Sequence, residues 1–60
     1  MINELLTISE VAEKLQVSEK TVRNWVDAGK LEAFRFGQAY RIRVEDFDSF
    51  VEASRVNKEN

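Results

Sequence analysis

The chain has 60 residues, enough for one small domain over residues 1–60, and 43% of them are apolar, which favours a folded domain over a disordered segment. It contains no cysteine and no histidine, which excludes disulfides and removes the usual zinc ligands and the usual general base at neutral pH. The net charge is −2, but residues 14–43 carry a net +4, whereas residues 1–13 and 44–60 carry −3 each. A basic centre of this kind suits a polyanionic partner, and it also fits an ordinary solvated surface of mixed charge.

Nothing in the sequence indicates a membrane span, a secretion signal or an enzyme. The longest apolar runs are two or three residues, and the chain does not begin with a basic region followed by an apolar stretch. There is no glycine-rich phosphate loop and no nucleophile–base pair, and Glu45, Asp46 and Asp48 lack the spacing of a calcium loop. We therefore expect a cytoplasmic domain that is not an enzyme and needs no cofactor or metal.

The first predicted element is a helix over residues 8–15. Thr7 and Glu10 have the spacing of a capping box, in which each side chain accepts a hydrogen bond from the backbone N–H of the other residue. Leu6 before this cap and Val11 after it are spaced as a hydrophobic staple. The apolar positions of one helical face follow at Ile8, Val11, Ala12 and Leu15.

A second helix is predicted over residues 19–28. Ser18 is a favourable N-cap, and Gly29 stands where a helix end favours a left-handed residue. The apolar face of this helix consists of Val22, Trp25 and Val26. Two short helices separated by a tight turn match the helix-turn-helix pattern.

Beyond Gly29, apolar residues alternate with arginines in steps of two, which predicts a β-hairpin with a loop at residues 37–39. The alternating apolar residues are Phe34, Phe36, Tyr40 and Ile42, and the arginines are Arg35, Arg41 and Arg43. We expect the apolar side chains to face the core and the three arginines to share the outer face.

A third helix is predicted over residues 45–55, with acidic residues in its first turn, and a frayed tail over residues 56–60.

Opposite its apolar face, the second helix carries Lys20, Arg23 and Asn24. Lysine and arginine neutralise phosphates or read guanine, and asparagine reads adenine through two hydrogen bonds. Asp27 would repel phosphate, but it lies near the end of the helix that tends to point away from a groove. The alternative is an ordinary solvated face; the preceding helix and tight turn favour DNA recognition.

The hairpin arginines suit the phosphates or the minor groove beside such a helix. The alternative is that they pair with acidic residues such as Glu32, Glu45 or Asp46. Gln38 at the hairpin tip bonds to the DNA backbone or faces water. The aromatic residues fit stacking on single-stranded nucleic acid or core packing, and the small size of the domain favours packing. They are Trp25, Phe34, Phe36, Tyr40, Phe47 and Phe50.

Several segments, taken in order, resemble the excisionase family, a branch of the MerR-like winged-helix domains. The segments similar to its helix-turn-helix are LTISEVAEKLQVS at residues 6–18 and TVRNW at residues 21–25. Those similar to its wing are GKL at residues 29–31, AFRFG at residues 33–37 and YRI at residues 40–42. Those similar to its closing helix are DF at residues 46–47 and FV at residues 50–51, so that the likeness covers about residues 5–54.

The resemblance implies a mainly α, small winged-helix fold: a helix-turn-helix, a two-stranded hairpin wing and a third helix. It places the second helix in the major groove of double-stranded DNA and the hairpin on the adjacent minor groove or backbone. The groove-reading positions that it implies are Ser18, Lys20, Thr21, Arg23 and Asn24. The wing positions that it implies are Arg35, Gln38, Tyr40 and Arg41, to which the predicted basic face adds Arg43.

The chain departs from the family pattern at three places. Gln16 replaces the glycine common in the inter-helix turn, where a non-glycine left-handed residue costs about 1 kcal/mol. Glu32 replaces a proline common after the second helix, and residues 38–39 replace a wing tip that is often basic. Each lost phosphate contact weakens binding and reduces its salt dependence by about 0.9 log units, which favours repeated sites or a partner protein.

Two functions follow from the sequence. The first is sequence-specific binding of double-stranded DNA, as an excisionase-like architectural factor or a small transcription regulator. The second is a protein-interaction module that docks on an integrase or other recombinase, or on another partner, and binds DNA weakly. The family resemblance allows both, because excisionases bend DNA and also contact a recombinase.

Overall fold

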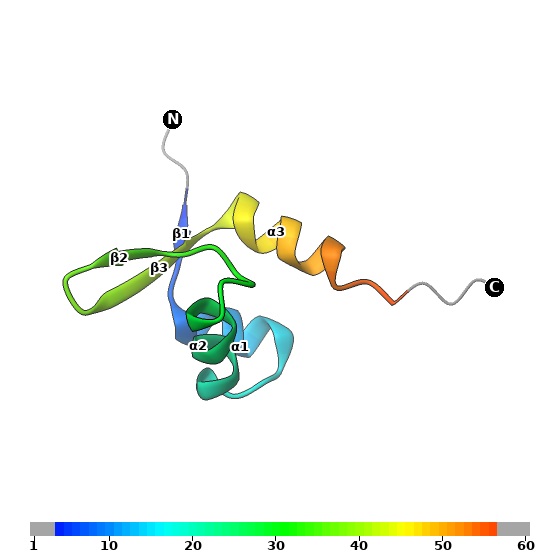
Figure 1. Cartoon of the computed structure of the whole chain (residues 1–60), viewed down its shortest axis with the longest axis horizontal. Coiled ribbons are helices and arrows are strands. Elements are labelled where there is room, and N and C mark those ends of the chain that lie inside the picture. The colour runs from blue at the N-terminus through cyan, green and yellow to red at the C-terminus, as the bar shows by residue number, and fades with distance from the viewer. Residues whose placement is uncertain (1–3, 57–60) are drawn as a thin grey trace.

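In the computed structural model, which describes residues 4–56, three helices accompany a three-stranded antiparallel sheet. The elements follow the order β1 (Leu5–Leu6), α1 (Ile8–Leu15), α2 (Glu19–Asp27), β2 (Phe34–Phe36), β3 (Ala39–Arg43) and α3 (Val44–Ala53). Figure 1 shows the β2–β3 hairpin and α3 projecting in opposite directions from the centre of the fold, where α1 and α2 pack together. This is the arrangement of a small winged helix-turn-helix domain, as the sequence predicts.

The capping box at the start of α1 is confirmed. The backbone N–H of Thr7 donates to Oε1 of Glu10 at 2.9 Å, and the backbone N–H of Glu10 donates to Oγ1 of Thr7 at 3.0 Å. Leu6 and Val11, the expected staple, are both buried in the core. The helix has the predicted bounds, because local capping and an apolar face of period 3.6 specify the same segment.

The turn after α1 depends on a strained residue. Gln16 has a φ of 58° and a ψ of 46°, in the left-handed region that normally favours glycine. The N–H groups of Gln16 and Val17 donate to the carbonyls of Glu13 at 3.2 Å and Ala12 at 3.0 Å, which completes a Schellman motif. The left-handed position expected from the family pattern is therefore present, occupied by glutamine.

The second helix is also capped at both ends as predicted. Oγ of Ser18 accepts the N–H of Thr21 at 3.1 Å. At the other end Gly29 has a φ of +80°, and the N–H of Lys30 donates to the carbonyl of Trp25 at 2.9 Å. The helix ends at Asp27, one residue earlier than predicted.

The strand β1 is absent from the sequence-based prediction. It pairs with β3 at the edge opposite β2, with Leu5 opposite Arg43 and Leu6 opposite Ile42, so the strand order is β1-β3-β2. Two residues are too few to show an alternating pattern, and this explains why β1 is not predicted. The addition makes β3 the central strand of the sheet.

The predicted orientation of the hairpin is wrong. Phe36 lies opposite Ala39, and Arg35 lies opposite Tyr40, which means that only two residues form the loop. Opposed residues share a face, so Arg35 lies on the core-facing side with Tyr40 and Ile42. The three arginines therefore do not share an outer face. The reason is the length of the loop. A three-residue loop would place Phe36 opposite Tyr40, on the core-facing side. The two-residue loop shifts the pairing by one residue, so Arg35 takes that side, and Phe34 and Phe36 lie on the outer face.

The outer face of the sheet is consequently partly apolar. Phe34 is 44% exposed and Phe36 is 57% exposed, and their rings stack with centroids 6.5 Å apart. The prediction that these two aromatic residues pack in the core is therefore wrong. Arg41 and Arg43 share this outer face with them.

The core lies between the helices and the inner face of the sheet. Its buried members are Leu6, Ile8, Val11, Ala12, Val22, Leu31 and Ile42. The predicted inward face of α2 is confirmed, because Val22 is fully buried and Trp25 and Val26 pack against the core. Tyr40, Phe47 and Phe50 also pack against it, as expected of aromatic residues in so small a domain.

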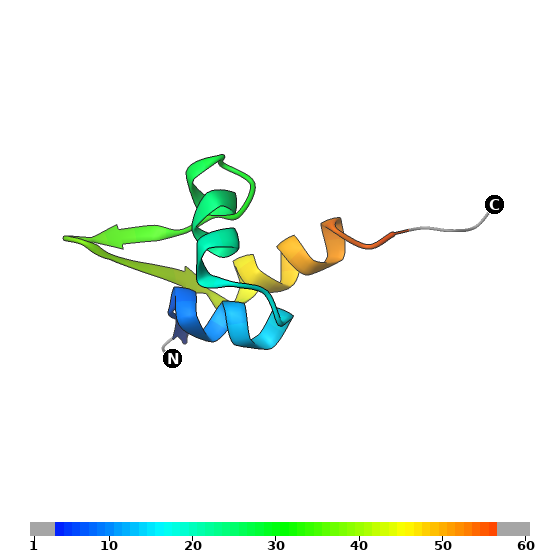
Figure 2. The ribbon, with the colours of Figure 1, turned by 90° about the horizontal axis from the view of Figure 1, so that it is seen from below.

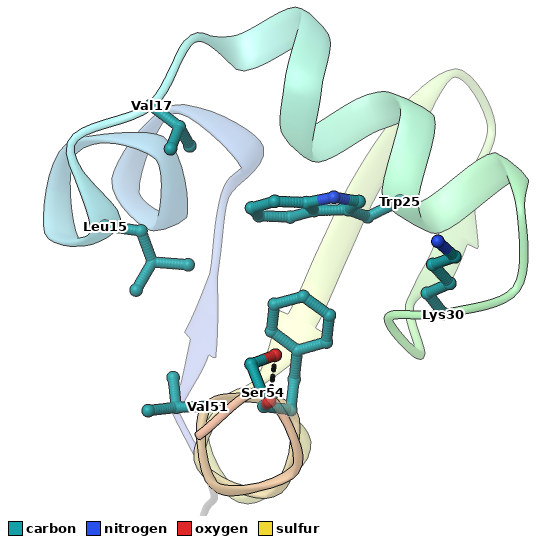
Figure 3. Close-up of a pocket in the computed structure, with 7 residues that line it drawn as sticks. Leu15, Val17, Trp25, Lys30, Val51 and Ser54 are labelled. Carbon is teal, nitrogen blue, oxygen red and sulfur yellow. Dashed lines mark hydrogen bonds between the residues drawn. The ribbon is translucent and has the colours of Figure 1, made fainter. Parts of the chain in front are cut away.

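The third helix packs on the core through an aromatic contact. The rings of Trp25 and Phe50 lie 4.9 Å apart between centroids. Beside this contact an open apolar pocket of about 370 Å³ separates α3 from α1 and α2 (Figure 3). The helix spans Val44–Ala53 rather than residues 45–55. Most of the predicted tail, residues 57–60, lies outside the described part of the chain. Within residues 4–56 no helix combines the length and the apolar character needed to cross a membrane.

Candidate nucleic-acid interface

The outward face of α2 is polar and accessible. Because Val22, Trp25 and Val26 turn inward, Lys20, Arg23 and Asn24 are left exposed on the opposite side of the helix. The described residues place no carboxylate within 4.0 Å of either cation. This face offers two positive charges and an amide to a ligand outside the protein.

Ser18 and Thr21 stand at the start of the same helix, but part of their bonding capacity is used locally. Oγ of Ser18 accepts the N–H of Thr21, and the two hydroxyl oxygens lie 2.9 Å apart. Ser18 is exposed and Thr21 is half-buried. Their positions beside Lys20 suit contact with a ligand, while their first role is to cap α2.

The base of the hairpin lies beside α2, as Figures 1 and 2 both show. Tyr40 is the point of contact: the guanidinium carbon of Arg23 lies 5.4 Å from the centroid of its ring, and that of Arg35 lies 5.8 Å from the same centroid. Both distances are in the range of cation–π interactions. The contact between Arg23 and Tyr40 thus joins the helix to the hairpin, and Arg35 lies near the same ring from the neighbouring strand.

Gln38 and Arg41 are placed differently from this cluster. Gln38 is exposed at the tip of the hairpin. Arg41 lies on the outer face of the sheet, and its Nη1 donates to the carbonyl of Tyr40 at 2.8 Å. The structure therefore brings Arg35 and Tyr40 together with α2 but directs Arg41 to the other face.

Arg43 is held by acidic residues of its own chain. Its Nε donates to Oδ2 of Asp46 at 3.1 Å, and its Nη1 lies 3.4 Å from Oε2 of Glu45. Its guanidinium carbon also lies 5.4 Å from the centroid of Phe34. The hydrogen bond to Asp46 and the negative charge of Asp46 raise the pKa of Arg43. This is the structural pairing that the sequence left open as an alternative for the hairpin arginines.

Sequence reasoning named Arg23, Arg35 and Tyr40 but missed the contact between them. That contact depends on the two-residue loop, because only then does Arg35 stand opposite Tyr40 on the inner face. The sequence contains one signal of it, Gly37, whose φ of 66° suits a tight two-residue turn.

The fold and the exposed polar face of α2 are those of a helix-turn-helix domain, and comparison of the sequence with known families gives the same class. Residues 5–55 match the sequence profile of a family described as "Helix-turn-helix domain". The match covers most of the chain, which therefore belongs to this helix-turn-helix domain family.

Proteins with similar sequences have names that refer to transcriptional repression or to DNA binding. The chain is 46% identical over 54 residues to the transcriptional repressor DcmR of Methylorubrum extorquens, a match covering 87% of this chain and 20% of DcmR. It is 37% identical over 51 residues to the "Putative DNA-binding protein Rv0500A" of Mycobacterium tuberculosis strain H37Rv, covering 85% of this chain and 65% of that protein. The "Putative DNA-binding protein MT0521" of strain CDC 1551 gives the same values. The chain thus spans a fifth of the first relative and about two thirds of the others.

Proposed function

We propose that this domain binds double-stranded DNA in a sequence-specific manner and regulates transcription. In this proposal α2 enters the major groove and the β2–β3 hairpin lies along the adjacent backbone or minor groove. The observation that carries it is the exposed face of Lys20, Arg23 and Asn24 on the second helix of a helix-turn-helix, next to Arg35 of the hairpin. Family membership supports DNA binding, and the name of DcmR favours transcriptional repression over excision as the biological setting.

Within this interface we assign base reading to Lys20 and Asn24. Both are exposed on α2, and their side chains suit hydrogen bonds to guanine and adenine edges, respectively. Gln38 at the hairpin tip suits a sugar or phosphate contact. Arg41 and Arg43 lie on the opposite face of the hairpin, and Arg43 is already paired, so we leave them out of the primary interface.

The direct experiment is selection of bound sequences from a pool of random DNA duplexes, followed by titration of the preferred duplex. Asn24→Ala should weaken binding by about 1–3 kcal/mol and relax the preference at one base position. Arg55→Gln is the matched control, because it changes an exposed residue beyond α3 that pairs with Glu52. Enrichment of no sequence, or equal losses in both variants, would contradict the proposal.

A second role, docking on a protein such as a recombinase, has one specific observation in its favour. The outer face of the hairpin exposes the stacked rings of Phe34 and Phe36, beside Arg41. Exposed aromatic pairs of this kind are typical of protein contact surfaces. The two roles use opposite faces of one hairpin, so Phe36→Thr should leave DNA binding unchanged if that face serves a protein partner.

A further inference from the structure

Arg23 belongs to α2 and Arg35 to the next element, β2, and both lie near the ring of Tyr40. Each guanidinium carbon lies within 6 Å of the centroid of Tyr40, so the two carbons are at most about 11 Å apart. Tyr40 is half-buried and belongs to the central strand β3, whereas both arginines are exposed. The ring is therefore held by the fold and the two charges stay at the surface.

Two cations gathered in this way lack a compensating anion within the described part of the chain. Among residues 4–56 neither Arg23 nor Arg35 has a carboxylate within 4.0 Å. Arg43 and Arg55, by contrast, are each paired with an acidic neighbour. Both exposed guanidinium groups can therefore pair with an anion from outside the protein.

The hydrogen bonds made by Arg35 leave its outer edge available. Its Nε donates to the carbonyl of Gly37 at 3.0 Å, which fixes the side chain along the hairpin turn. Within residues 4–56 its two terminal nitrogens make no hydrogen bond, so they are available to a ligand. Arg35 is exposed, and a guanidinium that lies over an aromatic ring can still donate two N–H groups to one phosphate.

We propose that Arg23, Tyr40 and Arg35 form a single phosphate-binding unit at the junction of α2 and the hairpin, in which Tyr40 positions both arginines. This inference rests on the proposed DNA-binding function and deepens it. The ligand is a phosphodiester of the DNA backbone, because the unit lies at the surface between the helix that enters one groove and the hairpin that follows the next. Arg23 is thereby assigned to the backbone, and sequence reading is left to Lys20 and Asn24.

A backbone contact can be tested without knowing the preferred site. The probes are two 20-base-pair duplexes of unrelated sequence, titrated between about 50 and 200 mM salt. Arg23→Gln and Arg35→Gln should each weaken binding by the same factor on both duplexes and reduce the salt slope by about 0.9. Arg55→Gln, which removes the same charge elsewhere, should leave affinity and slope unchanged.

The positioning role of Tyr40 has its own readout. Tyr40→Phe keeps the ring and should bind like the wild type, whereas Tyr40→Leu removes both cation–π contacts and should lower affinity several-fold. Because the three residues act together, the loss in a double variant carrying Arg23→Gln and Tyr40→Leu should be smaller than the product of the two single losses. If Tyr40→Leu proves unfolded by circular dichroism, the combination of Arg23→Gln with Arg35→Gln provides the same test, since both side chains are exposed.

The outcomes separate the two proposals. Suppose that Lys20→Gln weakens binding, while the affinity loss of each double variant equals the product of the two single losses. The proposed phosphate-binding unit is then wrong, and the proposal that the domain binds DNA is unaffected. The unit is equally wrong if Arg23→Gln acts on one duplex sequence only, because that is the behaviour of a base contact. If the wild-type domain binds neither duplex at 50 mM salt nor any duplex from the random pool, the proposed function itself fails.

Discussion

Single residues decide how the two helices of the helix-turn-helix end. Gln16 and Gly29 occupy the same position in two Schellman motifs, with φ values of 58° and +80°. Both positions require a left-handed backbone, but only Gly29 adopts it without strain, because glycine has no Cβ. The side chain of Gln16 is exposed and adds little packing.

These two positions give opposite predictions for stability. Gln16→Gly should relieve about 1 kcal/mol of backbone strain in the folded state. Because glycine also gives the unfolded chain more conformational entropy, the net increase in the free energy of unfolding should be about 0.5 kcal/mol. Gly29→Ala should destabilise by about 1 kcal/mol through strain alone, because a Cβ at that position meets no atom within 4 Å. Urea unfolding monitored by Trp25 fluorescence measures both changes. A loss of stability in Gln16→Gly would contradict the assigned turn.

At the level of elements, the structure shows which features the sequence specifies. The starts of α1 and α2 are predictable because Thr7, Glu10 and Ser18 act on backbone groups three residues away. The faces of β2 are not, because they depend on whether the loop has two or three residues, and the alternation of aromatic and basic residues is the same in either case.

The same difference affects the candidate site. The exposed face of α2 follows from helical periodicity and was predicted as found, whereas the grouping of Arg35 with Tyr40 and Arg23 requires the hairpin register. Arg43 was assigned to the interface from its alternation alone. Its pairing with Asp46 depends on how α3 leaves β3, which no local pattern describes.

The register of the hairpin predicts unequal effects for two apolar residues. Ile42 is fully buried, so Ile42→Ala should cost about 2–5 kcal/mol. Phe36 is 57% exposed on the outer face, so Phe36→Thr should cost less than about 1 kcal/mol. If the ring of Phe36 faced the core instead, its replacement would be among the most damaging in the domain, and thermal unfolding of the two variants distinguishes the registers.

Across the whole molecule, charge and shape are arranged along one direction. The hairpin and α3 project to opposite sides (Figures 1 and 2). The cations of the candidate interface lie on α2 and the hairpin, whereas α3 carries Glu45 and Asp46 in its first turn. A net charge of −2 therefore does not oppose binding of a polyanion at α2 and the hairpin, where the exposed cations gather.

The most direct test of this arrangement is a titration of the ¹⁵N-labelled domain with its selected duplex, followed by the chemical shifts of the backbone amides. We expect the changes to concentrate at residues 18–24 of the turn and α2 and at residues 35–40 of the hairpin, while those of α3 stay small. Changes centred on α3, with the amides of α2 unaffected, would contradict the assignment of this face as the DNA-binding surface.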